Sequence, residues 1–138
     1  MGKNISPYNA LAYLDKLCEL FAVPSPGLAL DASELDSKPN ILAAYLVDER
    51  MICLRSNLIH PKLLAHEFGH YMYHYYNNFI YRSNDMSEAW AYYFEVMYEA
   101  DGFNFNCSYC GATKPIVMLN TGDVQCSTCG SIFSLLYY

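Results

Sequence analysis

The sequence predicts an α+β fold made of a main domain and a small β appendage at the C-terminal end. Apolar residues recur at helical spacing near the start of the chain and again around its middle. Two short aliphatic runs, separated by a charged turn, lie between these segments. Two C-x-x-C pairs follow in the last quarter of the 138 residues. We therefore expect the main domain at residues 1–101 and the appendage at residues 102–138.

One helix and a small antiparallel sheet are expected first. Leucines and a phenylalanine repeat at helical spacing over residues 8–23, with charged residues on the opposite side. A P-S-P-G segment then ends this helix. The aliphatic runs at residues 41–47 and 51–55 predict an antiparallel hairpin. Residues 28–30 are a candidate short strand before it.

Two further helices should complete the main domain. Pro61 suits the first turn of a helix that runs to about residue 77. The Ser83-Asn84-Asp85 segment should open the next helix, at about residues 86–100. Gly102 is a candidate left-handed cap just beyond its end, because glycine adopts positive φ without steric cost.

The first of these two helices contains His66-Glu67-Phe68-Gly69-His70, an H-E-x-x-H pattern inside an apolar run. Residues four apart share one helix face, so His66 and His70 can present imidazole nitrogens to one metal ion. The Glu67 carboxylate can reach a water molecule there without being a ligand. This arrangement is typical of zinc hydrolases. We predict zinc ligands at His66 and His70, and a catalytic general base at Glu67.

A two-histidine zinc site needs a third protein ligand. Glu88, Glu95 and Glu99 form one stripe on the next helix, since they are spaced by seven and four residues. Glu88 is favoured because it follows His70 by 18 residues, which leaves room for one turn and an antiparallel return. Glu95 is the alternative ligand. The competing interpretations are a solvated charged stripe, or a capping box that pairs Glu88 with Asp85 at the helix start.

The other two histidines are expected to lie outside the metal site. His74 follows His66 by eight residues. On an ideal helix it therefore lies roughly 80° around the axis and more than about 10 Å along it. A hydrogen-bonding or packing role is expected for His74. His60 precedes Pro61 and suits a helix cap or a position at the rim of the site.

Residues 66–74 resemble the H-E-L-G-H-x-x-x-H segment of the ImmA/IrrE family of zinc metallopeptidases. The segment Glu88-x-x-Ala91-Tyr92-x-Phe94 is similar to the E-x-x-A-N-x-F-A motif of that family, in which the glutamate completes the zinc site. Tyr92 stands in place of the usual asparagine, and the next residue after Phe94 is glutamate in place of alanine.

The resemblance covers roughly residues 8–100. It implies a minimal zincin-like fold, in which one helix carries two histidine ligands and a second helix carries the glutamate. It also implies peptidase activity, with a protein substrate such as a helix-turn-helix repressor of transcription.

The appendage carries four cysteines in two C-x-x-C-G turns. A glycine after the second cysteine fits a tight loop whose backbone N–H groups point at the sulfurs. Four thiolates form a closed tetrahedral zinc site with no position for a substrate. We therefore predict a structural zinc ribbon, with short strands at residues 116–119 and 132–136, rather than disulfides or redox pairs. The predicted ligands are Cys107, Cys110, Cys126 and Cys129.

The two isolated cysteines, Cys18 and Cys53, lie in apolar surroundings. Both are expected to be buried small hydrophobic residues rather than nucleophiles.

Composition limits the function and the location of the protein. The chain is 54% hydrophobic and 16% charged, so it can bury a core. Its net charge is −6, and Lys114 is the only basic residue after Asp101, which argues against phosphate binding by the ribbon. No apolar run approaches the roughly 18–20 residues of a membrane span. The N-terminus lacks the features of a signal peptide. A cytoplasmic protein without a membrane segment is expected.

These observations together predict a zinc-dependent endopeptidase with one catalytic and one structural zinc ion. A SprT-like protease is the first alternative, because such enzymes also join an H-E-x-x-H helix to a zinc ribbon, and they degrade protein crosslinked to DNA. The second alternative is a zinc-stabilised interaction module without catalytic activity. The sequence specifies neither the substrate nor the oligomeric state.

Overall fold

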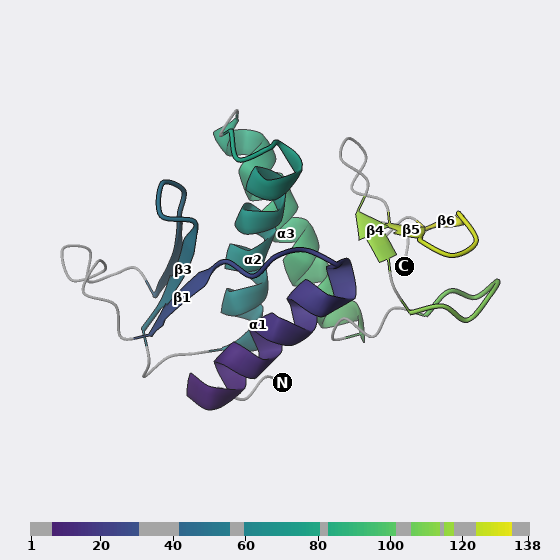
Figure 1. Ribbon diagram of the computed structural model, residues 1–138, viewed down its shortest axis with the longest axis horizontal. Helices are drawn as coiled ribbons and strands as arrows, with labels where there is room; N and C mark the ends of the chain where they lie inside the picture. The colour runs from purple at the N-terminus through teal and green to yellow at the C-terminus, as the bar shows by residue number, and fades with distance from the viewer. Residues whose placement is uncertain are drawn as a thin grey trace.

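The computed structural model describes residues 7–30, 42–55, 60–80, 83–101, 106–113, 115–117 and 124–133. Three helices and two small sheets make up this part of the chain (Figure 1). Their bounds are α1 Pro7–Phe21, β1 Gly27–Leu30, β2 Ala43–Leu46, β3 Met51–Leu54, α2 Pro61–Tyr76, α3 Asn84–Asp101, β4 Pro115–Val117, β5 Val124–Cys126 and β6 Ile132–Phe133. The predicted mixture of helices and strands is confirmed. The predicted cap at Gly102 lies outside the described residues.

The first sheet has the order β1-β3-β2. The predicted hairpin is confirmed, because β2 and β3 pair antiparallel with Ala43 opposite Leu54. The prediction of a wholly antiparallel sheet is wrong, because β1 pairs parallel to β3. Strand β3 takes the central place since Ile52, Cys53 and Leu54 are all buried, as in a strand that is covered on both faces. Strand β2 is therefore left at an edge of the sheet.

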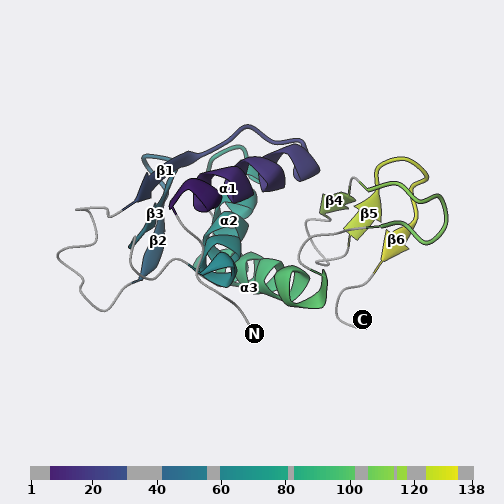
Figure 2. The same cartoon turned by 90° about the horizontal axis from the view of Figure 1, so that it is seen from below.

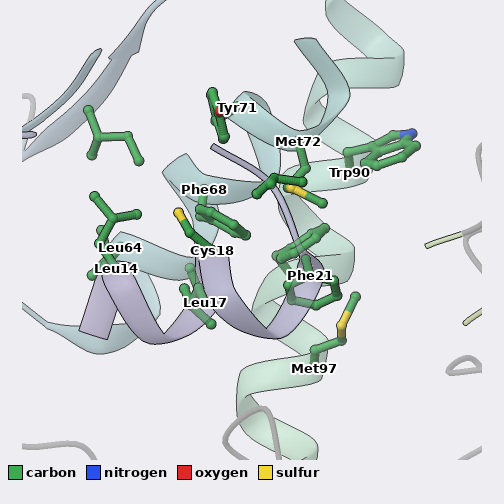
Figure 3. Close-up of a cluster of buried hydrophobic side chains, with 14 of the residues drawn as sticks. Leu14, Leu17, Cys18, Phe21, Leu64, Phe68, Tyr71, Met72, Trp90 and Met97 are labelled. Carbon is green, nitrogen blue, oxygen red and sulfur yellow. The ribbon is translucent and has the colours of Figure 1, made fainter. Parts of the chain in front are cut away.

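The core lies between α1, α2 and α3. Figure 3 shows Leu14, Leu17 and Phe21 of α1 directed toward Leu64 and Phe68 of α2. The ring centroids of Phe21 and Phe68 lie 6.1 Å apart. Full burial of a side chain such as Phe68 contributes about 1.5–3 kcal/mol, so this face of α2 is firmly anchored in the core. The histidines of α2 are left on its other side.

Helices α2 and α3 pack at very short range where Gly69 meets Ala91. A Cβ atom added at Gly69 would lie 2.5 Å from the Ala91 Cα, a distance that real Cβ atoms do not show. Glycine at this position is therefore a steric requirement of the helix pair. The close approach brings the histidines of α2 within reach of the glutamates of α3.

Side chains cap the N-terminal ends of both α2 and α3. The His60 ring caps α2, because its Nδ1 accepts a hydrogen bond from the Lys62 backbone N–H at 3.0 Å. This confirms one of the roles expected for His60. Helix α3 begins earlier than predicted, and Ser83 caps it through a bond of 3.2 Å from the Met86 N–H. The capping box at Asp85 and Glu88 is therefore wrong, and the Glu88 side chain is available for another role.

The second sheet belongs to the C-terminal unit and has the order β4-β5-β6, all antiparallel. Strand β5 was not predicted, because three residues are too few to show a pattern. Parts of the two predicted strands lie outside the described residues. Figures 1 and 2 show this unit and the first sheet on opposite sides of the three helices. Val124 of β5 is buried with the core of the helices, and β4 contacts α1.

None of the helices described has both the length and the apolar character that crossing a membrane requires.

Candidate metal centre

Side chains of α2 and α3 pair in sequence along the line where the helices meet. Near the start of α2, the Lys62 Nζ lies 3.1 Å from a carboxylate oxygen of Glu99. One turn later His66 contacts Glu95, and His70 in the following turn contacts Ser87. The order runs forward on α2 and backward on α3, so the two helices are antiparallel at the site. The residues on α2 are spaced by four, and those on α3 are spaced by four and then by eight, so each set lies along one helix face.

The structure brings together the three predicted zinc ligands. The Nε2 of His70 lies 3.2 Å from one carboxylate oxygen of Glu88, and the Nε2 of His66 lies 3.8 Å from the other. One ligand atom from each of the three residues lies within 4.8 Å of the other two. Tetrahedral zinc with bonds of about 2.1 Å needs ligand atoms roughly 3.4 Å apart. The donor set and its spacing therefore fit one zinc ion.

Glu95, the alternative ligand, lies on the other side of the His66 ring. Its Oε2 accepts a hydrogen bond from the His66 Nδ1 at 2.6 Å. Because Nδ1 carries this contact, the Nε2 of His66 is the nitrogen that faces Glu88. The solvated-stripe interpretation also fails for Glu95, whose side chain is only 23% exposed. It holds better for Glu88 and Glu99, which are each 57% exposed.

Ser87 is a site residue that the sequence did not indicate. It is fully buried, and its Oγ lies 2.6 Å from the Nδ1 of His70. The position four residues before Ala91 places Ser87 on the α3 face that packs against α2. Its spacing from Ala91 would have indicated Ser87 as a site residue, but only once Ala91 was known to lie at the helix contact. Each imidazole of the site thus has a partner on its Nδ1.

Glu67 is buried beside the ligand cluster, with 7% of its surface exposed. Desolvation raises the pKa of its carboxyl to about 7, while the nearby His66 acts in the opposite direction. A hydrogen bond from the Tyr45 backbone also favours the ionised form. A carboxyl whose pKa lies near neutrality can both accept and release a proton, as a general base and acid must.

Two cavities flank Glu67 along the edge strand β2. The larger has a volume of about 670 Å³ and is lined by Leu42, Leu63 and Glu95 among others. The smaller has a volume of about 360 Å³ and is lined by residues that include Tyr45 and Glu88. Both are also lined by Ala43, His66 and Glu67. His66 and the buried Glu67 therefore lie at the border between the two cavities.

His74 lies outside the ligand cluster, where a packing or hydrogen-bonding role was expected. Its Nδ1 lies 2.7 Å from the hydroxyl of Tyr45, and its ring packs against Phe79. Burial lowers the pKa of His74, which favours the neutral ring that can accept a bond from the tyrosine.

The four cysteines of the C-terminal unit form a second cluster. The Sγ atoms of Cys107 and Cys129 lie 3.6 Å apart, and those of Cys110 and Cys126 lie 3.5 Å apart. All four lie within 4.8 Å of one another. Tetrahedral zinc with Zn–S bonds of about 2.3 Å requires roughly 3.8 Å between sulfurs. The cysteines are free thiols in this structure, so the disulfide interpretation is not supported.

The two turns that hold these sulfurs have matching geometry. Gly111 and Gly130 have φ values of 77° and 80°, and each donates its N–H to the first cysteine carbonyl of its turn. Glycine is favoured there because positive φ strains other residues. Hydrogen bonds from Ser131 lower the pKa of Cys129 to about 6, which favours the thiolate that binds metal.

Cys18 and Cys53 are buried, as expected. Burial raises the pKa of Cys18 to about 11, so its thiol stays protonated and unreactive near neutral pH.

The structure thus contains two groups of side chains suited to hold metal ions, one open to cavities and one closed. Compared with models of protein families, with curated proteins and with solved structures, the chain gives no match. The chemistry of the site is therefore inferred from its own residues.

Proposed function

We propose that this protein is a zinc-dependent peptidase with a zincin-like catalytic unit and a structural zinc ribbon. One observation carries the proposal. The buried Glu67 carboxyl lies beside the group formed by His66, His70 and Glu88, and it lines two cavities together with His66. A purely structural metal site would be closed by a fourth side chain and would have no need of a buried acid at its edge.

In this proposal His66, His70 and Glu88 would hold the catalytic zinc. The ion would supply Lewis acidity toward a water molecule and the scissile carbonyl. Glu67 would accept a proton from the water as the water oxygen bonds to the carbonyl carbon. It would then pass that proton to the leaving nitrogen as the C–N bond breaks, which restores the carboxylate. Burial favours the first step, because a carboxylate with a pKa of about 7 is a stronger base than an ordinary glutamate.

Strand β2 offers a place for the substrate backbone. The Arg55 N–H donates to the Leu42 carbonyl at 3.1 Å, so Leu42 directs its backbone groups toward β3. Because the backbone N–H and C=O groups of successive residues point to opposite sides of a strand, those groups of Ala43 would point away from β3, toward the cavities. A peptide that adds antiparallel to β2 would begin in the smaller cavity and end in the larger one. Its scissile bond would then lie beside Glu67.

The proposed substrate is a protein, with a helix-turn-helix repressor as the first candidate. The resemblance of residues 66–74 to a family of metallopeptidases supports this choice by analogy. We propose that the enzyme acts in the cytoplasm, where unpaired thiols such as those of the ribbon persist. The net charge of −6 does not favour a DNA-directed protease, which needs basic groups for phosphate.

The proposal is tested by the Glu67→Gln substitution. This change keeps the shape of the side chain but removes its ability to accept a proton. We expect peptide cleavage to fall by about 10²–10⁴-fold, the usual contribution of a general base. Cleavage would be measured on a mixed peptide library and on a panel of helix-turn-helix repressors, and zinc content by atomic emission. Zinc content should stay at two per chain, one for each side-chain group.

Glu49→Gln is the matched control, because Glu49 is exposed in the turn between β2 and β3 and lines neither cavity. It should retain full activity. Equal activity of the Glu67→Gln and Glu49→Gln proteins would overturn the assigned mechanism. A wild-type protein that binds both zinc ions but cleaves nothing would favour the interaction module, and salt-sensitive DNA binding would favour the SprT-like alternative.

A further inference from the structure

We propose that Glu95, itself held by Lys62, is a positioning residue that fixes His66 as a metal ligand and makes it the stronger of the two histidine donors. The inference rests on the proposed zinc site, but it concerns residues outside the ligand set. In the resemblance described above, the position of Glu95 is usually alanine. The contact is therefore a feature of this chain rather than a consequence of the motif.

The hydrogen bond between His66 and Glu95 determines which nitrogen can bind metal. An ionised carboxylate only accepts hydrogen bonds, so Nδ1 of His66 must carry the hydrogen that points at Oε2 of Glu95, 2.6 Å away. The Nε2 lone pair is then left on the side of the ring that faces Glu88. The carboxylate thus selects the tautomer and the ring orientation that ligation requires.

Glu95 is held from its other side. The Lys62 Nζ lies 3.8 Å from Oε1 of Glu95 and 3.1 Å from Glu99. Lys62 is 40% exposed, whereas Glu95 is 23% exposed and lines the larger cavity. The two oxygens of Glu95 therefore face different partners, one cationic and one imidazole. This arrangement limits the rotation of the carboxylate.

His70 has a different partner. Its Nδ1 contacts the hydroxyl of Ser87, which is neutral and fully buried. Hydrogen bonds to charged groups are roughly twice as strong as those between neutral groups. An anionic acceptor also raises the electron density of the imidazole, which makes its other nitrogen a better donor. The two imidazoles of the site are therefore unequal, and His66 is the stronger donor.

The test compares metal binding by Glu95→Gln, Glu95→Ala, Ser87→Ala and Glu99→Gln in the full chain. Glu99→Gln is the matched control, because it removes a charge one turn away that also contacts Lys62 but does not contact His66. Metal-free protein would be titrated with Co²⁺, whose thiolate and imidazole complexes absorb differently. The cysteine site serves as an internal reference in each protein, and zinc affinity would be obtained by competition.

We expect Glu95→Ala to weaken metal binding at the histidine site by about 10–100-fold, the range found for such supporting residues, and to shift its Co²⁺ spectrum. Glu95→Gln, which retains an acceptor oxygen without charge, should fall between Glu95→Ala and wild type. Ser87→Ala should weaken binding less than Glu95→Ala, and Glu99→Gln should remain within about twofold of wild type. The cysteine site should be unchanged throughout.

Thermal unfolding of the metal-free proteins separates positioning from folding, because a merely structural role would alter stability without altering the spectrum of the bound metal. The inference is overturned if Glu95→Ala binds Co²⁺ like wild type, or if Ser87→Ala weakens binding equally. Absence of any metal at the histidine site of wild type would instead overturn the proposed function. The two failures are thus distinguishable.

Discussion

At the scale of single residues, the three histidines of α2 differ in what faces their Nδ1 atoms. His66 meets a carboxylate, His70 a buried serine, and His74 the hydroxyl of Tyr45. Only the first two direct Nε2 toward Glu88. The chemistry of each ring is therefore determined by its neighbour as well as by its place in the motif.

Tyr45→Phe tests the assignment of His74 outside the metal site. The change leaves the buried Nδ1 of His74 without its 2.7 Å partner, and an unpaired buried polar atom costs about 1–3 kcal/mol. We expect a loss of that size in the free energy of urea unfolding. Zinc content should remain at two per chain. Loss of one zinc ion from this variant would show that His74 belongs to a ligand set.

The sequence predicted that His66, His70 and Glu88 come together, but not the contacts behind them. Spacing by four placed His66 and His70 on one face, and that periodicity does not depend on the partner helix. The role of Glu95 depends on which side of the His66 ring it meets, a property of the helix crossing that no single-helix pattern contains. Ser87 was missed for the same reason.

At the scale of elements, the site depends on how closely α2 and α3 approach. Gly69 meets Ala91 with no space for a Cβ atom, and Ser87 and Glu95 lie one turn on either side of Ala91. One contact between small residues therefore sets the distance between α2 and the α3 side chains Ser87, Glu88 and Glu95.

Gly69→Ala should separate the two helices at this point. The added Cβ would lie 2.5 Å from the Ala91 Cα and 2.7 Å from the Trp90 carbonyl oxygen, both of which are backbone atoms with little freedom to move. Overpacking costs about 1–3 kcal/mol. Alanine regains only about 0.8–1 kcal/mol of helix propensity. We expect a net loss of stability in thermal unfolding, together with weaker zinc binding at the histidine site.

Gly27→Ala is the matched control for this prediction. Its added Cβ would lie 3.2 Å from the flexible Met51 side chain, which can move aside. Zinc affinity should be unchanged in this protein. A Gly69→Ala protein as stable as wild type, with unaltered zinc affinity, would show that close helix packing does not set the site geometry.

The elements themselves were largely predictable. Helical periodicity located α1, α2 and α3 to within a few residues, because each buries one apolar face. Pairing in the sheet was harder to predict. Strand β1 pairs with β3 rather than with β2, which puts the most buried strand at the centre, and burial is a property of the whole fold.

At the scale of the whole molecule, the two groups of potential metal ligands differ in access. The cysteine group is closed by four sulfurs and belongs to a small sheet that contacts α1. The histidine group is flanked by two cavities and an edge strand. One zinc ion would therefore stabilise a unit with little core of its own. The other would have space for a substrate beside it.

The central claim is that His66, His70 and Glu88 bind a zinc ion separate from that of the cysteines. Zinc content per chain, measured after gel filtration for wild type and Glu88→Ala, tests it most directly. Two zinc ions in wild type and one in Glu88→Ala are expected, with the remaining ion held by the cysteines. One zinc ion in wild type, or two in both proteins, would contradict the account.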